Sequence, residues 1–193
     1  SQSILTLSSL NQGEKLLALL RITIANLIQK DFQKIPFNVK KINKLISEGA
    51  VNNIKDEKNK KYFVSFFLFI SSLYPLLEKE NNENDLDRVP HIGESHCLSF
   101  SHQTISLSKE LKSIQPVLLT GAKAWHFATH NNNKWKDSLT QQLRKHNYSD
   151  NVFVSFGEID CRKNEGILHY SIKHNKDISK VCEKTIKGYL DYM

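Results

Sequence analysis

The sequence has 193 residues, a formal net charge of +7 at pH 7 and a pI near 9.2. This length can bury a core for one domain, or for one domain with a helical appendage. The basic excess is greatest between Lys30 and Lys61, where no nucleic-acid motif or aromatic stacking platform accompanies it, so we interpret it as a solvated helical face and expect no nucleic-acid partner.

Apolar residues recur at helical spacing in the first 80 residues. The first stripe comprises Leu16, Leu20, Ile24, Leu27 and Ile28, and the second, after Pro36, comprises Val39, Ile42, Leu45 and Ile46. A third apolar stretch, Tyr62 to Leu77, contains three serines and Pro75 and is shorter than the roughly 20 apolar residues that span a membrane. It predicts a buried helix and no membrane span.

We therefore expect residues 1–85 to form an all-helical region that offers a surface to a protein partner. A tetratricopeptide-like remnant is one interpretation, although no full signature of about 34 residues is visible. The stretch from Glu78 to Asp85 is polar and charged, as in a linker or an exposed loop, and places a domain boundary near Asp85.

Beyond this boundary, residues 86–193 predict strands that end at Gly93, Gly121 and Gly157. Helical patterns alternate with them, from about Ser99 to Lys112, from Trp135 to Arg144 and from about Asp177 onward. Strand, helix and strand in succession imply right-handed crossovers and a parallel sheet. The fold class is therefore α/β, with a parallel sheet domain preceded by the helical region.

Polar and potentially reactive residues follow each of these glycine turns. The carboxyl ends of parallel strands lie along one edge of a sheet, so the three turns are expected to converge on a single crevice. Ser95 comes directly after the first strand, and its hydroxyl could act as a nucleophile while glycine amides on neighbouring turns stabilise an oxyanion.

At this point the chain resembles the SGNH (GDSL-like) hydrolases. Gly93-Glu94-Ser95 stands where that family has Gly-Asp-Ser, and Gly121 matches a glycine whose amide contributes to the oxyanion hole. The stretches 91–100, 121–127 and 156–162 are similar to a bacterial subgroup found behind tetratricopeptide-like repeats. From Asp87 to Met193, the resemblance implies the first part of a three-layer domain that removes acyl groups from small-molecule or carbohydrate esters.

Two departures from the family pattern bear on activity. The third block reads Gly157-Glu158-Ile159-Asp160, so Ile159 replaces the family's oxyanion-hole asparagine, and the loss of one such donor typically costs about a hundred- to a thousandfold in turnover. The late Asp-x-x-His that supplies the base has no match, and we expect the chain to be a fragment. The alternative is a non-catalytic binding or scaffold module with a degenerate hydrolase crevice, which Ile159 favours.

Further residues near the turns are candidates for substrate binding. Glu158, Asp160 and Arg162 could position a substrate, together with Gly93, Glu94 and Gly157, or they could form a structural ion pair that ties the turn to the next segment. Trp125 and Trp135 suit stacking on a sugar ring, but we favour helix packing for both.

The remaining chemistry-bearing residues predict no metal and no cofactor. None of the eight histidines is obviously the base, and no grouping has metal-ligand spacing with a third ligand. The three cysteines, Cys97, Cys161 and Cys182, form no Cys-x-x-Cys pair, and for Cys97 and Cys161 we favour packing over a reactive thiol. This cysteine usage and the lack of a signal peptide favour a cytoplasmic location, unless a targeting segment precedes Ser1.

Overall fold

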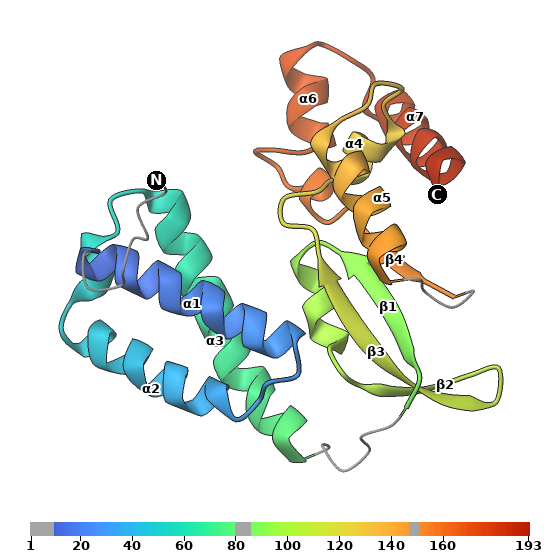
Figure 1. Ribbon diagram of the computed structural model, residues 1–193. Helices are drawn as coiled ribbons and strands as arrows, with labels where there is room; N and C mark the ends of the chain where they lie inside the picture. Colours follow the sequence, from blue (N-terminus) through green and yellow to red (C-terminus); the bar gives the residue numbers. More distant parts are fainter. Residues whose placement is uncertain (1–9, 80–85, 147–150) are drawn as a thin grey trace, which may run out of the picture. The chain divides into compact units, whose positions relative to one another are not determined.

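The computed structural model describes residues 10–79, 86–146 and 151–193 (Figure 1). The chain divides into two compact units, a helical unit of residues 1–85 and a sheet unit of residues 86–193. The division falls in the polar stretch that precedes Leu86. The protein is thus of the mixed α/β class, with helices first and a sheet second.

The helical unit contains α1 (Gln12–Ile28), α2 (Lys34–Ser47), the short 3-10 helix η2 (Ala50–Asn53) and α3 (Glu57–Lys79). A capping box starts α1, where the amide of Glu14 donates to the Asn11 side chain and the amide of Asn11 donates to the Glu14 carboxylate. Pro36 lies in the first turn of α2, where a helix does not need its amide hydrogen. The helices predicted from apolar spacing are confirmed.

The third helix differs from the prediction in its burial. Phe63, Ile70 and Leu77 are buried at a spacing of seven residues, whereas Leu68 and Leu76 are each 61 % exposed. Only one stripe of α3 packs against its unit, because a helix lying on one side of a small helical group covers one face. Within the described residues, no helix is long and apolar enough to cross a membrane.

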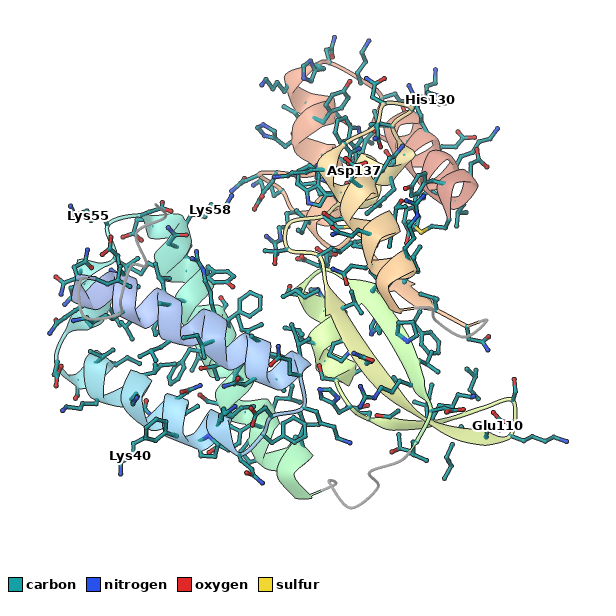
Figure 2. All side chains as sticks on the ribbon, in the orientation of Figure 1. Lys40, Lys55, Lys58, Glu110, His130 and Asp137 are labelled. Atoms are coloured by element: carbon teal, nitrogen blue, oxygen red, sulfur yellow. The ribbon has the colours of Figure 1, made fainter. Side chains whose placement is uncertain are left out.

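Lysines of the helical unit project from its surface. Lys40, Lys55 and Lys58 are exposed, and their side chains point away from the helices (Figure 2). Other lysines pair with carboxylates one helical turn away, as in Lys34 with Asp31. This arrangement is that of the solvated helical face predicted from the charge pattern.

The sheet unit contains four strands in the order β2-β3-β1-β4. They are β1 (Arg88–Gly93), β2 (Thr104–Leu107), β3 (Glu110–Leu118) and β4 (Phe153–Ser155). The central strand β1 runs parallel to both β3 and β4, with Gly93 opposite Leu118 on one side and Ser155 on the other. β2 is antiparallel to β3, so the sheet is mixed and the prediction of an all-parallel sheet is wrong.

The predicted helix from Ser99 to Lys112 is also wrong. A 3-10 helix, η3 (Ser95–Phe100), follows β1, and the chain then forms a hairpin of β2 and β3. The two turn residues, Ser108 and Lys109, have φ of 52° and 71°. Two-residue hairpin turns of this kind normally carry Asn-Gly, and the absence of glycine hid the hairpin in the sequence.

Helices complete the sheet unit: α4 (Ala124–Ala128), α5 (Lys134–His146), the 3-10 helix η4 (Ile159–Cys161), α6 (Ile167–Lys173) and α7 (Ile178–Tyr192). The predictions of α5 and α7 are confirmed, and α7 begins at the Asp177 cap, whose side chain accepts from the amide of Lys180. The core beneath them comprises Ile92, Val117, Leu119, Ala122, Phe127 and Leu139. This core packs helices α4 and α5 against β1 and β3, next to the loops in which the candidate site residues lie.

Candidate functional site

The loops that follow β1, β3 and β4 are called the first, second and third loop. They meet at one edge of the sheet, because β1 runs parallel to β3 on one side and to β4 on the other. The amide of Leu119 donates to the carbonyl of Gly93 over 2.8 Å, and the amide of Glu94 donates to the carbonyl of Ser155 over 3.3 Å. Any Cβ atom at position 93 would overlap Ser155. Glycine at this position therefore lets β4 approach the end of β1 closely.

Glu94 joins the first loop to the third. Its side chain is buried, at 2 % exposure, and its Oε1 accepts hydrogen bonds from the amides of Gly157 at 3.2 Å and Glu158 at 2.7 Å. Burial raises the pKa of Glu94, and the two amides partly offset this effect. The predicted substrate-binding residues Gly93, Glu94 and Gly157 are thus brought together, with the Glu94 carboxylate turned to the backbone of the third loop.

Asp160 joins the third loop to the second. It is 3 % exposed, and its carboxylate accepts from the amides of Ala124 at 2.8 Å and Trp125 at 3.4 Å. Burial raises the pKa of Asp160, against the opposite effect of these amides. A Cβ atom at position 166 would overlap the Asp160 backbone, so Gly166 is needed behind this contact. The buried carboxylates of Glu94 and Asp160 therefore hold the three loops together.

Ser95 lies at the start of η3, beside these contacts. It is half-buried, and its hydroxyl forms no hydrogen bond with any residue in the described part of the chain. His96 is exposed and does not bond to Ser95. Gly121 is exposed on the second loop with φ of 73°, a conformation that favours glycine. The hydroxyl and the glycine loop are accessible, but no described histidine is hydrogen-bonded to Ser95.

Arg162 is engaged in ion pairs. Its guanidinium donates to both carboxylate oxygens of Glu158, the shortest distance being 2.8 Å, and to Glu165 at 3.3 Å. These carboxylates raise the pKa of Arg162. Ile159 is buried at 8 % exposure. The structural ion pair predicted for Glu158, Asp160 and Arg162 is thus present, but Asp160 takes no part in it. Because the guanidinium of Arg162 is held by these carboxylates, it is not free to supply the oxyanion-hole donor that Ile159 lacks.

Glu94, His96 and Glu158 could hold a cation. One potential ligand atom from each lies within 4.8 Å of the others. However, Glu158 is already paired with Arg162, and the positive charge of that guanidinium opposes a metal ion at the same carboxylate. We assign no metal to this cluster.

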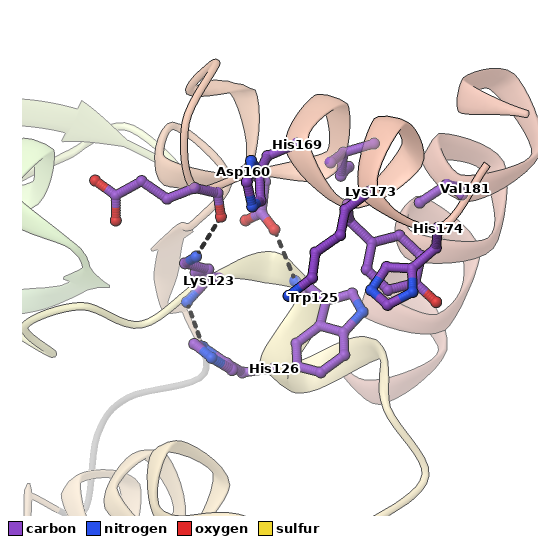
Figure 3. A pocket seen from close by; sticks show the side chains of 12 residues that line it. Lys123, Trp125, His126, Asp160, His169, Lys173, His174 and Val181 are labelled. Atoms are coloured by element: carbon purple, nitrogen blue, oxygen red, sulfur yellow. Dashed lines mark hydrogen bonds between the residues drawn. The ribbon is translucent and has the colours of Figure 1, made fainter. Parts of the chain in front are cut away.

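A cavity of about 250 Å³ opens beside the second and third loops (Figure 3). Its walls come from the start of α4, from the turn before α6, and from α6 and α7. The lining residues are Lys123, Trp125, His126, Asp160, Glu165, Gly166, Ile167, His169, Tyr170, Lys173, His174 and Val181. Ser95 is not among them. The sequence did not predict α6, which carries His169.

His126 is one of the residues that line this cavity. Its Nδ1 accepts from the amide of Lys123 over 2.9 Å, and its ring stacks on Trp135 with 3.6 Å between centroids. Burial, together with the charges of Lys123 and Lys134, lowers the pKa of His126 to about 4. The packing role predicted for Trp135 is confirmed, whereas Trp125 is 45 % exposed and lines the cavity.

One polar pair has no counterpart in the sequence predictions. Nε2 of His91 lies 2.8 Å from Oγ of Ser155, and His91 is 7 % exposed between the rings of Phe100 and Phe153. Burial lowers the pKa of His91. No local pattern signals this pair, because it joins two strands that are distant in sequence. We interpret it as a buried structural pair.

The cysteines next to the site differ from each other. Cys97 is buried, and burial raises the pKa of its thiol to about 12, which confirms packing for this residue. Cys161 is exposed, so the prediction of packing is wrong there. The reason is that the 3-10 turn η4 directs Ile159 and Asp160 inward and leaves Cys161 on the outside.

Comparisons with family models, with curated proteins and with solved structures found no match to this chain. The fold and the site define a mixed α/β domain whose accessible serine and glycine loops meet at the carboxyl edge of three parallel strands. Its function is therefore inferred from geometry and from the chemistry of these residues.

Proposed function

We propose that the sheet unit is part of a serine acyl hydrolase of SGNH type, with the three-layer architecture of that class, and that it acts on esters such as O-acylated carbohydrate. The observation that carries this proposal is the position of Ser95. Its unengaged hydroxyl follows the central parallel strand, and buried carboxylates hold the loops of Gly121 and Gly157 to its own loop. Such preorganisation is what an oxyanion site requires.

In this mechanism Oγ of Ser95 attacks the ester carbonyl carbon. The amides of Ser95 and Gly121 stabilise the negative charge that forms on the carbonyl oxygen. The tetrahedral intermediate collapses, the alcohol leaves with the proton taken from the serine, and water then hydrolyses the acyl-serine bond to release the acid. Because no histidine of the described residues is hydrogen-bonded to Ser95, this proton transfer depends on an added base such as imidazole.

The first test compares hydrolysis of p-nitrophenyl acetate by the chain and by Ser95→Ala, with and without imidazole as an external base. We expect a Ser95-dependent rate that increases with imidazole, because a serine without a base is a poor nucleophile. Ser99→Ala changes a half-buried serine of the same 3-10 helix and should retain this rate. Equal rates for the chain and Ser95→Ala at each imidazole concentration would overturn the proposal.

A second candidate is a binding module that uses the same crevice without catalysis. The buried Ile159 in place of an amide donor favours it. A serine-directed fluorophosphonate separates the two functions, because it should label Ser95 alone in an activated site and leave a binding module unlabelled. Peptide mass spectrometry locates the label.

A further inference from the structure

Two of the aromatic residues that line the cavity are exposed. Trp125 is 45 % exposed and Tyr170 is 41 % exposed. Tyr170 is held by its own helix, since its ring lies 4.5 Å from that of His174. Exposed aromatic faces in a concave site are stacking surfaces for a ring-shaped ligand, whether planar or a sugar with its C–H face.

The acidic groups of this cavity are already satisfied. Asp160 accepts two backbone amides, and the carboxylate of Glu165 pairs with Arg162. The ammonium of Lys123 donates to the carbonyl of Glu165 over 2.6 Å. Neither carboxylate is therefore free to receive a ligand cation or to repel a ligand anion strongly.

Lys173 differs from these groups. Within the described residues it has no ion pair and no hydrogen bond through its ammonium. Its side chain extends along the cavity beside Trp125 (Figure 3). An unpaired ammonium next to an aromatic wall suits a ligand that carries both a negative charge and a ring, and His169 and His174 add nitrogen atoms for hydrogen bonds to hydroxyl groups.

The size of the cavity limits the ligand. Its volume of about 250 Å³ is below the range of about 300–1,000 Å³ typical of sites for drug-sized molecules. One monosaccharide unit is of suitable size, whereas a nucleotide with base, ribose and phosphate is too large to be enclosed.

We propose that this cavity binds an acid-bearing sugar of the hexuronate type, with the carboxylate at Lys173 and the ring between Trp125 and Tyr170. Ser95 does not line this cavity, so sugar binding here is a proposal that goes beyond the proposed hydrolase function. Binding itself does not require Ser95, so the two proposals can fail separately.

The test measures binding of D-glucuronate, D-glucose and acetate to the full chain by calorimetry; none of the three ligands is an ester, so no hydrolysis interferes. Glucuronate should bind more tightly than either comparison ligand, because only glucuronate has both the ring and the charge. Lys173→Gln should weaken glucuronate about tenfold and leave glucose unchanged, whereas Trp125→Ala should weaken both sugars. Lys176→Gln, an exposed lysine outside the cavity, is the matched control.

Three results would overturn the inference: equal affinity for glucuronate and glucose, equal affinity for glucuronate and acetate, or no effect of Lys173→Gln. Circular dichroism of each variant checks that it is folded. Glucuronate binding without ester hydrolysis by the parent chain would retain the cavity assignment and reject the hydrolase, and hydrolysis without glucuronate binding would do the reverse.

Discussion

At the scale of single residues, Glu94 and Asp160 are the two groups on which the site depends. A buried carboxylate without partners is costly, and each of these accepts two backbone amides from a loop that is distant in sequence. The sequence indicated substrate binding for both. In the structure, Oε1 of Glu94 and both carboxylate oxygens of Asp160 instead accept from the chain's own amides, while Oε2 of Glu94 is buried without a hydrogen-bond partner.

We predict that Asp160→Ala lowers the free energy of unfolding by about 2–4 kcal/mol, because two buried amides lose their acceptor. Urea denaturation followed by circular dichroism measures this change. Asp191→Ala removes an exposed carboxylate and should change stability by less than about 0.5 kcal/mol. Equal stability of the two variants would show that Asp160 does not hold the loops together.

At the scale of elements, the hairpin of β2 and β3 replaces the predicted crossover helix. Its turn places Ser108 and Lys109 in the left-handed region, which disfavours residues with a Cβ atom. The strand pairing on either side, from Leu107 opposite Glu110 to Thr104 opposite Ser113, holds the turn in this conformation. The hairpin is therefore decided by pairing across the sheet.

Lys109→Gly should raise the free energy of unfolding by about 0.5–1 kcal/mol, because glycine adopts a φ of 71° without steric cost. Glycine loses more backbone freedom on folding than lysine does, which offsets part of this gain. Thermal unfolding measures the effect. Glu110→Gly, at the adjacent strand position without a positive φ, should destabilise the protein, and the same sign for both variants would contradict the turn assignment.

At the scale of the whole molecule, the two units have separate cores. Leu16, Leu20, Ile35 and Ile42 are fully buried in the helical unit, and the cluster around Ile92 and Phe127 is buried in the sheet unit. The groups with altered pKa values near the site all belong to the sheet unit. At acidic pH, stability should accordingly depend on pH through that unit.

His126 provides a pH test of stability. Its pKa is about 4 in the folded chain and ordinarily 6.5, so between these values the unfolded state holds a proton that the folded state lacks. The stability contribution of neutral His126 should therefore fall as the pH falls from about 6.5 to about 4.

The measurement compares the free energies of unfolding of the parent chain and His126→Gln from pH 7 to pH 4.5. The advantage of the parent over the variant should shrink towards low pH, because glutamine does not titrate. The pKa values of Glu94 and Asp160 are raised, so their contributions to stability change with pH in the direction opposite to that of His126. The pKa of His91 is lowered, so its contribution changes in the same direction as that of His126. All three residues are present in both proteins, so their contributions cancel in the difference. A constant difference across the range would contradict the neutral, buried His126.

The sequence alone determined the helical first unit, the three strands that end near glycines, and the meeting of their loops at one sheet edge. These features follow from local patterns, namely apolar spacing and chain breaks at Gly93, Gly121 and Gly157. Tertiary structure decided the hairpin at Ser108 and Lys109, the loop-joining role of the buried carboxylates and the cavity around Trp125. Each of these depends on residues far apart in the chain, whose contacts form only once the strands have paired and the core has packed.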